Sequence, residues 1–148
     1  MHNYKNLHIW QEGIKLARKI YEITSNFPTN EKYGIASQMT RAAVSIPSNI
    51  AEGAGRNSNK EFANFLSIAI GSLFELHTQI VICEQIGYIN PQVNKQLEEL
   101  TFTLQQQIAT YKQRIEEQKE TYSLKDGRTA KRSYSPKDDP TEKRSITK

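Results

Sequence analysis

The sequence predicts an all-α fold, an antiparallel up-down-up-down four-helix bundle. Apolar residues recur at three- and four-residue spacing in four segments, proline or glycine lies at the segment ends, and the connections are short. Short connections favour helices that alternate in direction. We place the helices at about residues 8–26, 31–54, 59–86 and 91–119, inside a bundle domain at 1–120.

The first helix, 8–26, precedes a proline. Its apolar positions are Trp10, Ile14, Ala17, Ile20 or Tyr21, and Thr24. Pro28 ends the helix, because the residue before a proline is pushed out of the α region. Thr29 or Asn30 offers an N-cap for the second helix, and Glu31 lies near its positive end.

The second helix, 31–54, has a proline inside it and three kinds of surface. A polar stripe holds Gln38, Arg41, Ser45, Asn49, Glu52 and Arg56; an apolar arc holds Ile35, Met39, Ala42, Ala43, Ile46 and Ile50; the remaining face is small, with Ser37, Thr40, Val44, Pro47, Ser48 and Ala51. A helix without a solvated side is expected to make contacts on more than one side. Pro47 costs roughly 3 kcal/mol in a helix interior. Either packing holds one continuous helix, or the chain breaks at Ile46 into two.

The third helix, 59–86, is apolar nearly all round. Ser58 and Glu61 form a capping-box pattern, and Gly87 suits a left-handed cap. The expected core stripe is Phe62, Phe65, Leu66, Ala69, Leu73, Leu76, Ile80 and Cys83, and Ile68, Ile70, Phe74, Val81 and Ile82 lie outside it. One bundle leaves a side of each helix in water, so this surplus predicts a subunit interface.

The fourth helix, 91–119, opens at Asn90, which caps it, with Pro91 in the first helical position. Near-heptad spacing predicts its core positions: Val93, Leu97, Leu100, Leu104, Ile108, Tyr111 and Ile115. Its other faces are Gln, Lys, Glu and Thr, which predicts a solvent-exposed side.

The run EKYGIASQMTRAAVSIPSNIAEGAGR at 31–56, followed by GSLFEL at 71–76, resembles the bacterial four-helix-bundle family of 23S rRNA intervening sequence proteins. That family is related to the accessory variability protein of diversity-generating retroelements. The resemblance covers about residues 7–118. It implies a four-helix protomer, a ring-shaped homo-oligomer, taken to be a pentamer, and no enzymatic activity.

The net charge of +4 lies entirely in the C-terminal segment. Residues 1–120 carry 12 Lys or Arg and 12 Glu, whereas residues 121–148 carry eight basic and four acidic residues. The segment lacks large apolar residues, so we expect a disordered basic tail. It is either a solubilising extension or an arm that contacts RNA or DNA backbone. The candidate nucleic-acid contacts are Arg56, Lys60, Lys125, Arg128, Lys131 and Arg132.

The polar stripe of the second helix has two interpretations. In the structural one, Arg41 faces the bundle and pairs with Glu75, within a network of Gln38, Arg41, Ser45, Asn49, Glu52 and Glu75. In the functional one, Arg41, Asn49 and Arg56 line a phosphate-binding channel.

The sequence shows no pattern for chemistry. His77 and Glu75 are two residues apart, so they do not share a helix face as a di-iron Glu-x-x-His pair would. The glycines at 53 and 55 follow a helix rather than a strand, unlike a phosphate loop. Cys83 is the sole cysteine, which excludes an internal disulfide, and its spacing suits a buried filler. We expect no enzyme, metal, cofactor or small-molecule substrate.

No apolar run approaches the roughly 18 residues of a membrane span, and the first residues open no signal peptide. We therefore expect a cytoplasmic protein without membrane contact. Its expected role is an oligomeric scaffold that engages structured nucleic acid or a nucleic-acid enzyme such as a reverse transcriptase. The alternative is a helical adaptor that binds only proteins.

Overall fold

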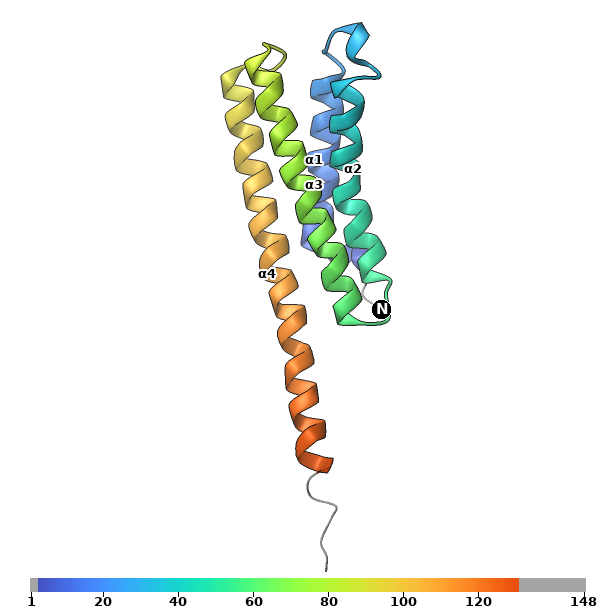
Figure 1. The fold of residues 1–148 in the computed structure, drawn as a ribbon. Coiled ribbons are helices and arrows are strands. Elements are labelled where there is room, and N and C mark those ends of the chain that lie inside the picture. The colour runs from blue at the N-terminus through green and yellow to red at the C-terminus, as the bar shows by residue number, and fades with distance from the viewer. Residues whose placement is uncertain (1–2, 131–148) are drawn as a thin grey trace, which may run out of the picture. The chain divides into compact units, whose positions relative to one another are not determined.

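The computed structural model describes residues 3–130, with side chains described to residue 118. These residues form four α-helices, two short 3-10 turns and no strand: η1 (Tyr4–Asn6), α1 (His8–Thr24), η2 (Thr29–Glu31), α2 (Ile35–Ala54), α3 (Asn59–Gln85) and α4 (Pro91–Ala130) (Figure 1). The chain divides into two compact units, Met1–Glu116 and Glu117–Lys148. The first holds the helical core, an all-helical fold of the four-helix-bundle kind.

Pro47 lies inside an unbroken α2, so the single-helix prediction is confirmed and a break at Ile46 is wrong. The proline is buried against α1 at Gly13, where an added Cβ would lie 3.3 Å from Pro47 Cβ. The small face of α2 is therefore used partly within the protomer. Burial of its neighbours Ile46 and Ile50, both 0% exposed, offsets the missing helical hydrogen bond.

The start of α2 differs from the prediction. Thr29 opens η2 instead of capping α2, which begins four residues later than expected, at Ile35. A side chain still supplies the missing acceptor: Glu31 Oε2 accepts a hydrogen bond from Ile35 N at 3.3 Å. Sequence spacing could not show that the residues between Glu31 and Ile35 form a turn.

The ends of α3 and the start of α4 confirm the capping signals. Ser58 Oγ accepts from Glu61 N at 3.2 Å, and Gly87 has φ +83°. Asn90 Oδ1 accepts from Val93 N at 2.8 Å. At the start of α3 and at the start of α4, the predicted cap residue therefore accepts from one of the terminal N–H groups.

The core lies between all four helices. Its fully buried larger side chains are Ile20, Met39, Ile46, Ile50, Phe62, Leu66, Leu73, Leu76, Ile80, Cys83, Leu97 and Ile108. Asn59 Nδ2 donates to Ile115 O at 3.2 Å, and the rings of Phe62 and Tyr111 meet edge to face at 5.8 Å. These two contacts join the start of α3 to α4.

Two expectations for α4 need correction. Leu100, expected in the core, is 41% exposed, whereas Thr101 is 3% exposed. The buried seam follows a four-three spacing through Leu97, Thr101, Leu104 and Ile108, so a polar residue occupies the position that hydrophobicity assigned to its neighbour. The helix also continues to Ala130 rather than ending near residue 119. The disordered tail was expected at 121–148, so the expectation is wrong for 121–130, which are helical, and its remainder, 131–148, lies outside the described residues.

The hydropathy of α3 over a membrane-length window was underestimated. By length and composition it is a helix that could cross a bilayer, contrary to the expectation that no apolar run approaches that length. Within the described chain its core stripe packs in the bundle, since Phe62, Leu66, Leu76 and Ile80 are each at most 1% exposed. A core helix of a helical bundle passes the same composition test.

Candidate interaction surfaces

Three members of one polar cluster join α2 to α3. The Oγ atoms of Ser45 and Ser72 lie 2.9 Å apart, and Asn49 Nδ2 donates to Ser45 O at 2.7 Å and to Ser45 Oγ at 2.9 Å. Ser72 Oγ also donates to Ile68 O at 3.1 Å. The predicted network therefore holds at Ser45 and Asn49. Ser72 was missed, although a serine on the edge of the apolar stripe of α3 was a readable signal.

The proposed ion pair between Arg41 and Glu75 does not form in the protomer. Both residues are exposed, and Glu75 Oε1 accepts instead from Gln79 Nε2 at 3.3 Å. The prediction assumed that Arg41 faces the core and must find a carboxylate. An exposed charge keeps its hydration, so nothing forces it to pair. Gln38 is exposed as well.

Arg56 is engaged at the end of α2. Its Nη2 lies 2.5 Å from Glu52 Oε1, and its guanidinium lies 4.8 Å from the centre of the Phe65 ring. Glu52 is thus paired with Arg56 rather than with the serine cluster, and Lys60 is exposed nearby in sequence. The tail candidates lie wholly or partly outside the described part of the chain. The description omits the side chains of Lys125 and Arg128 and the whole of Lys131 and Arg132. The three cavities described below are lined by none of Arg41, Asn49 and Arg56.

Large apolar side chains are exposed on α3 and α4. We use the name α3 patch for five of them: Ile68 (51% exposed), Phe74 (55%), Ile82 (43%), Ile86 (53%) and, from α4, Phe102 (60%). Between residues 62 and 83 the sole Lys, Arg, Asp or Glu is Glu75. Of the apolar surplus predicted for this helix, Ile68, Phe74 and Ile82 are therefore exposed on the protomer, whereas Ile70 and Val81 are half-buried. Phe102 was missed, because its neighbours in sequence are polar.

A second set of exposed apolar side chains lies on α1 and α2. This α1/α2 patch comprises Ile14, Tyr21 and Val44. Ile14 and Tyr21 are two turns apart on α1, and Val44 is one turn before Pro47, the residue that packs on α1. The two patches belong to different helix pairs.

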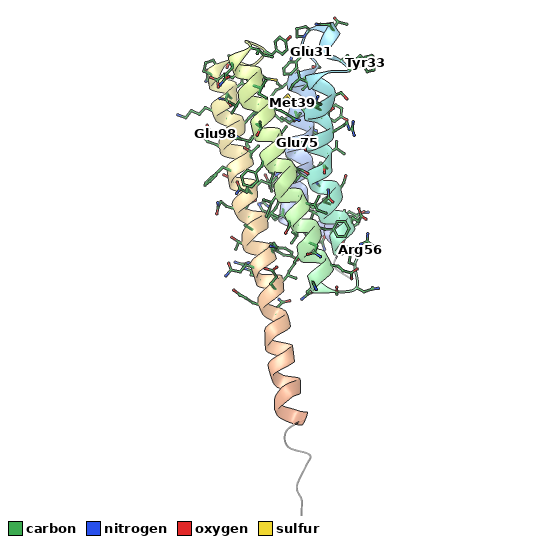
Figure 2. The ribbon with its side chains drawn as sticks, in the orientation of Figure 1. Glu31, Tyr33, Met39, Arg56, Glu75 and Glu98 are labelled. Atoms are coloured by element: carbon green, nitrogen blue, oxygen red, sulfur yellow. The ribbon has the colours of Figure 1, made fainter. Side chains whose placement is uncertain are left out.

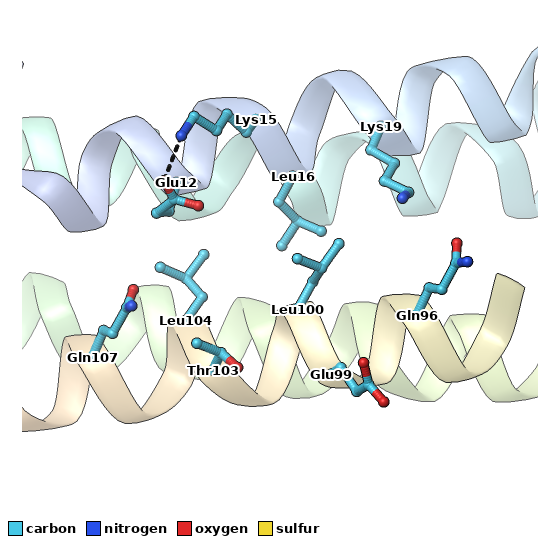
Figure 3. A pocket seen from close by; sticks show the side chains of 10 residues that line it. All are labelled: Glu12, Lys15, Leu16, Lys19, Gln96, Glu99, Leu100, Thr103, Leu104 and Gln107. Atoms are coloured by element: carbon cyan, nitrogen blue, oxygen red, sulfur yellow. Dashed lines mark hydrogen bonds and ion pairs between the residues drawn. The ribbon is translucent and has the colours of Figure 1, made fainter.

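Three cavities of similar size differ in the charge of their linings. A cavity of about 490 Å³ between α1 and α4 has Leu16, Leu100 and Leu104 pointing toward one another (Figure 3). Its charges balance, with two lysines and two glutamates. A second cavity of about 540 Å³, between α3 and α4, holds one lysine and two glutamates. The third, about 520 Å³ near the α1–α2 connection, holds Lys32 and no acidic residue.

The residues that the structure describes hold no group of three His, Cys, Asp or Glu side chains able to bind a metal. Cys83 is fully buried, with Sγ 3.5 Å from Met39 Sδ. Burial, together with a smaller effect of the negative charge of Glu31, raises its thiol pKa to about 11. The thiol is therefore protonated near neutral pH, as suits a core filler rather than a nucleophile.

Comparison with known proteins gives a family and a fold. Residues 5–126 match the profile of the 23S rRNA-intervening sequence protein family. A crystal structure titled a protein with unknown function from the S23 ribosomal protein family of Bacteroides thetaiotaomicron VPI-5482 aligns with a TM-score of 0.63 and 19% identity, covering 70% of this chain and 96% of that one. No curated protein sequence matches significantly. Since the profile spans most of the sequence, the chain belongs to the 23S rRNA-intervening sequence protein family.

Proposed function

We propose that this protein is a non-enzymatic scaffold that self-associates and engages nucleic acid or a nucleic-acid enzyme. The observation that carries the proposal is the α3 patch. Its five large apolar side chains are each between 43% and 60% exposed, and residues 62–83 of α3 contain one charged residue, Glu75. A second copy of the chain is the simplest cover for such a surface.

The positions of the patches support a ring. The α3 patch and the α1/α2 patch lie on different helices, so the α3 patch of one copy has a second, different apolar surface to meet on the next copy. Contact between two different surfaces is heterologous, and it gives a closed ring when the rotation between copies closes. The family resemblance favours a pentamer of up-down-up-down protomers. Short connections between the four helices agree with that topology.

The nucleic-acid part of the proposal is supported by the family's description and by the tail. The name of the family refers to intervening sequences of 23S rRNA. The excess charge of +4 lies at residues 121–148, and several tails in one assembly would add their weak phosphate contacts. We place the protein in the cytoplasm, without cofactor, membrane or small-molecule substrate. Its proposed relation to a reverse transcriptase follows the retroelement resemblance.

One observation favours a rival function. Residues 1–120 carry equal numbers of basic and acidic side chains, so the body has no excess charge to attract phosphate. An adaptor that binds only proteins through its apolar patches would have this composition.

Light scattering and salt-dependent oligonucleotide binding test both parts. In solution the full chain should have a mass of at least twice the 17.0 kDa of one chain. A double variant, Phe74→Glu with Ile82→Glu, should fall to the monomer mass. Gln106→Glu, an exposed position on α4 outside both patches, should not. A monomeric wild type would refute the scaffold.

For nucleic acid, the full chain is compared with a version that ends at Glu120. Weaker and less salt-dependent binding by the shorter chain would support the arm, because fewer counterions are released. Equal binding would exclude the arm. Absence of binding by both would leave the protein-binding adaptor as the function.

A further inference from the structure

Tyr33, in the connection between α1 and α2, is 88% exposed and has the most exposed large side chain of the described apolar and aromatic set. Figure 2 shows it pointing away from the helices, at the opposite end of α2 from Arg56. The Lys32 ammonium lies 5.6 Å from the centre of its ring. An aromatic ring that stays in water beside a cation contributes little to the stability of the fold.

The connection that presents Tyr33 is held in place. Glu31 accepts from Tyr88 Oη at 3.0 Å and from Ile35 N at 3.3 Å, so its carboxylate is engaged toward the bundle. Gly34 N donates to Glu31 O at 3.0 Å, and the Phe27 and Tyr88 rings lie 5.4 Å apart. The exposed ring is therefore carried by a preorganised loop, which lowers the entropy lost on binding.

Beside Tyr33 lies the cavity of about 520 Å³, which contains the ring itself, Tyr21, Lys32 and the hydroxyl-bearing residues Thr29 and Ser37. It is the one of the three cavities described whose lining has a net positive charge. Exposed aromatic faces, a cation and hydroxyl groups together match a nucleobase joined to a phosphate. A negatively charged protein segment would use the Lys32 ammonium but would not need the exposed Tyr33 ring beside it.

We propose that this cavity, with Tyr33 and Lys32 at its rim, is a contact site for single-stranded nucleic acid on the helical body. The inference rests on the nucleic-acid binding proposed above and gives it a location outside the tail. One base stacks on the Tyr33 ring, the adjoining phosphate lies near the Lys32 ammonium, and Thr29 and Ser37 offer hydroxyls to the sugar-phosphate backbone. Stacking of this kind tolerates any base.

The test measures binding of a fluorescein-labelled oligouridylate to the full 148-residue chain over a range of salt concentrations. Tyr33→Ala should weaken binding by roughly 5- to 150-fold, the loss expected for one stacked base. Tyr33→Phe keeps the ring and should bind within about two-fold of wild type. Lys32→Gln should lower the salt slope by about 0.7, whereas Lys15→Gln, already paired with Glu12, should leave it unchanged.

Circular dichroism and light scattering on each variant separate the outcomes. If the wild-type chain fails to bind at low salt, the proposed nucleic-acid function falls. If the wild type binds and Tyr33→Ala binds equally well, that function stands and this site is refuted. If Tyr33→Ala loses affinity only together with a fall in mass, Tyr33 contacts another copy of the chain, and the nucleobase site is again refuted.

Discussion

Substitution of Gly53 by alanine should destabilise the protein, although alanine is the better helix former. An ideal Cβ at Gly53 would lie 2.7 Å from Phe62 Cδ2 and 2.7 Å from Phe65 Cβ. Phe62 is 1% exposed, and the Phe65 Cβ moves only with the backbone of α3. The clash therefore has to be relieved by separating α2 from α3 or by repacking the core.

Overpacking of a close-packed core costs about 1–3 kcal/mol. Alanine recovers up to about 1 kcal/mol of helix propensity, and less in this last turn of α2, so we expect a net loss of about 1–2 kcal/mol. Gly71, in the middle of α3, is the matched control because an added Cβ meets nothing within 4 Å. Gly71→Ala should therefore stabilise the protomer by about 0.5–1 kcal/mol.

Thermal and chemical unfolding at one fixed protein concentration give the comparison. At roughly 4 °C per kcal/mol, the two variants should differ in Tm by about 6–12 °C, with wild type between them. Helix propensity alone predicts the same sign for both. Equal stabilisation of both variants would refute the close α2–α3 packing at Gly53. A Gly71→Ala variant that folds well but has a smaller mass would show that another copy contacts α3 there.

Further measurements test other contacts. The thiol pKa of Cys83 is raised from 9.0 to about 11, so its contribution to the free energy of unfolding is complete below pH 9 and lost as the pH rises toward 11; chemical denaturation across that range should show the fall, and a thiol reagent at pH 8 should react only with unfolded protein. A double-mutant cycle on Ser45→Ala and Ser72→Ala should give a coupling free energy of about 1 kcal/mol in urea denaturation, and additivity would show that their hydrogen bond adds no stability. Glu31→Ala should cost about 1 kcal/mol by removing the acceptor for Ile35 N, whereas Glu31→Gln, which keeps an acceptor oxygen, should lose less; a thermal melt compares them.

Local signals in the sequence were sufficient for most of the fold. The cap residues Ser58, Asn90 and Gly87 act through neighbours within a few positions, so their spacing contains the needed information. The α3 surplus was also predictable, because a helix that is apolar all round exposes apolar residues wherever its neighbours stop. The position of Pro47 was also interpreted correctly, because a proline inside a helix needs tertiary packing to offset its missing hydrogen bond.

Contacts between helices were harder to predict. The partner of Ser45 is Ser72, 27 residues away, and nothing in the periodicity of either helix sets their relative rotation. The same uncertainty produced the Arg41–Glu75 error, because a polar stripe shows which residues share a face but not what faces them. At Leu100 and Thr101 a shift of one residue decided which side chain entered the core. Tyr33 was missed because a lone aromatic in a turn has no periodicity.

The exposed side of α3 could be buried either by a second copy of the chain or by a bilayer, and its residues favour one of the two. Two of its hydroxyl groups donate within the helix: Ser67 Oγ to Ala63 O at 3.1 Å, and Thr78 Oγ1 to Phe74 O at 2.8 Å. Either cover could therefore bury them. Glu75 lies in the same stretch and is exposed, and a carboxylate at the centre of a bilayer costs about 2.5–3.5 kcal/mol. At a protein interface the same carboxylate can stay hydrated at the rim or meet a cation such as the unpaired Arg41 of another copy, so this charge favours a protein partner over lipid.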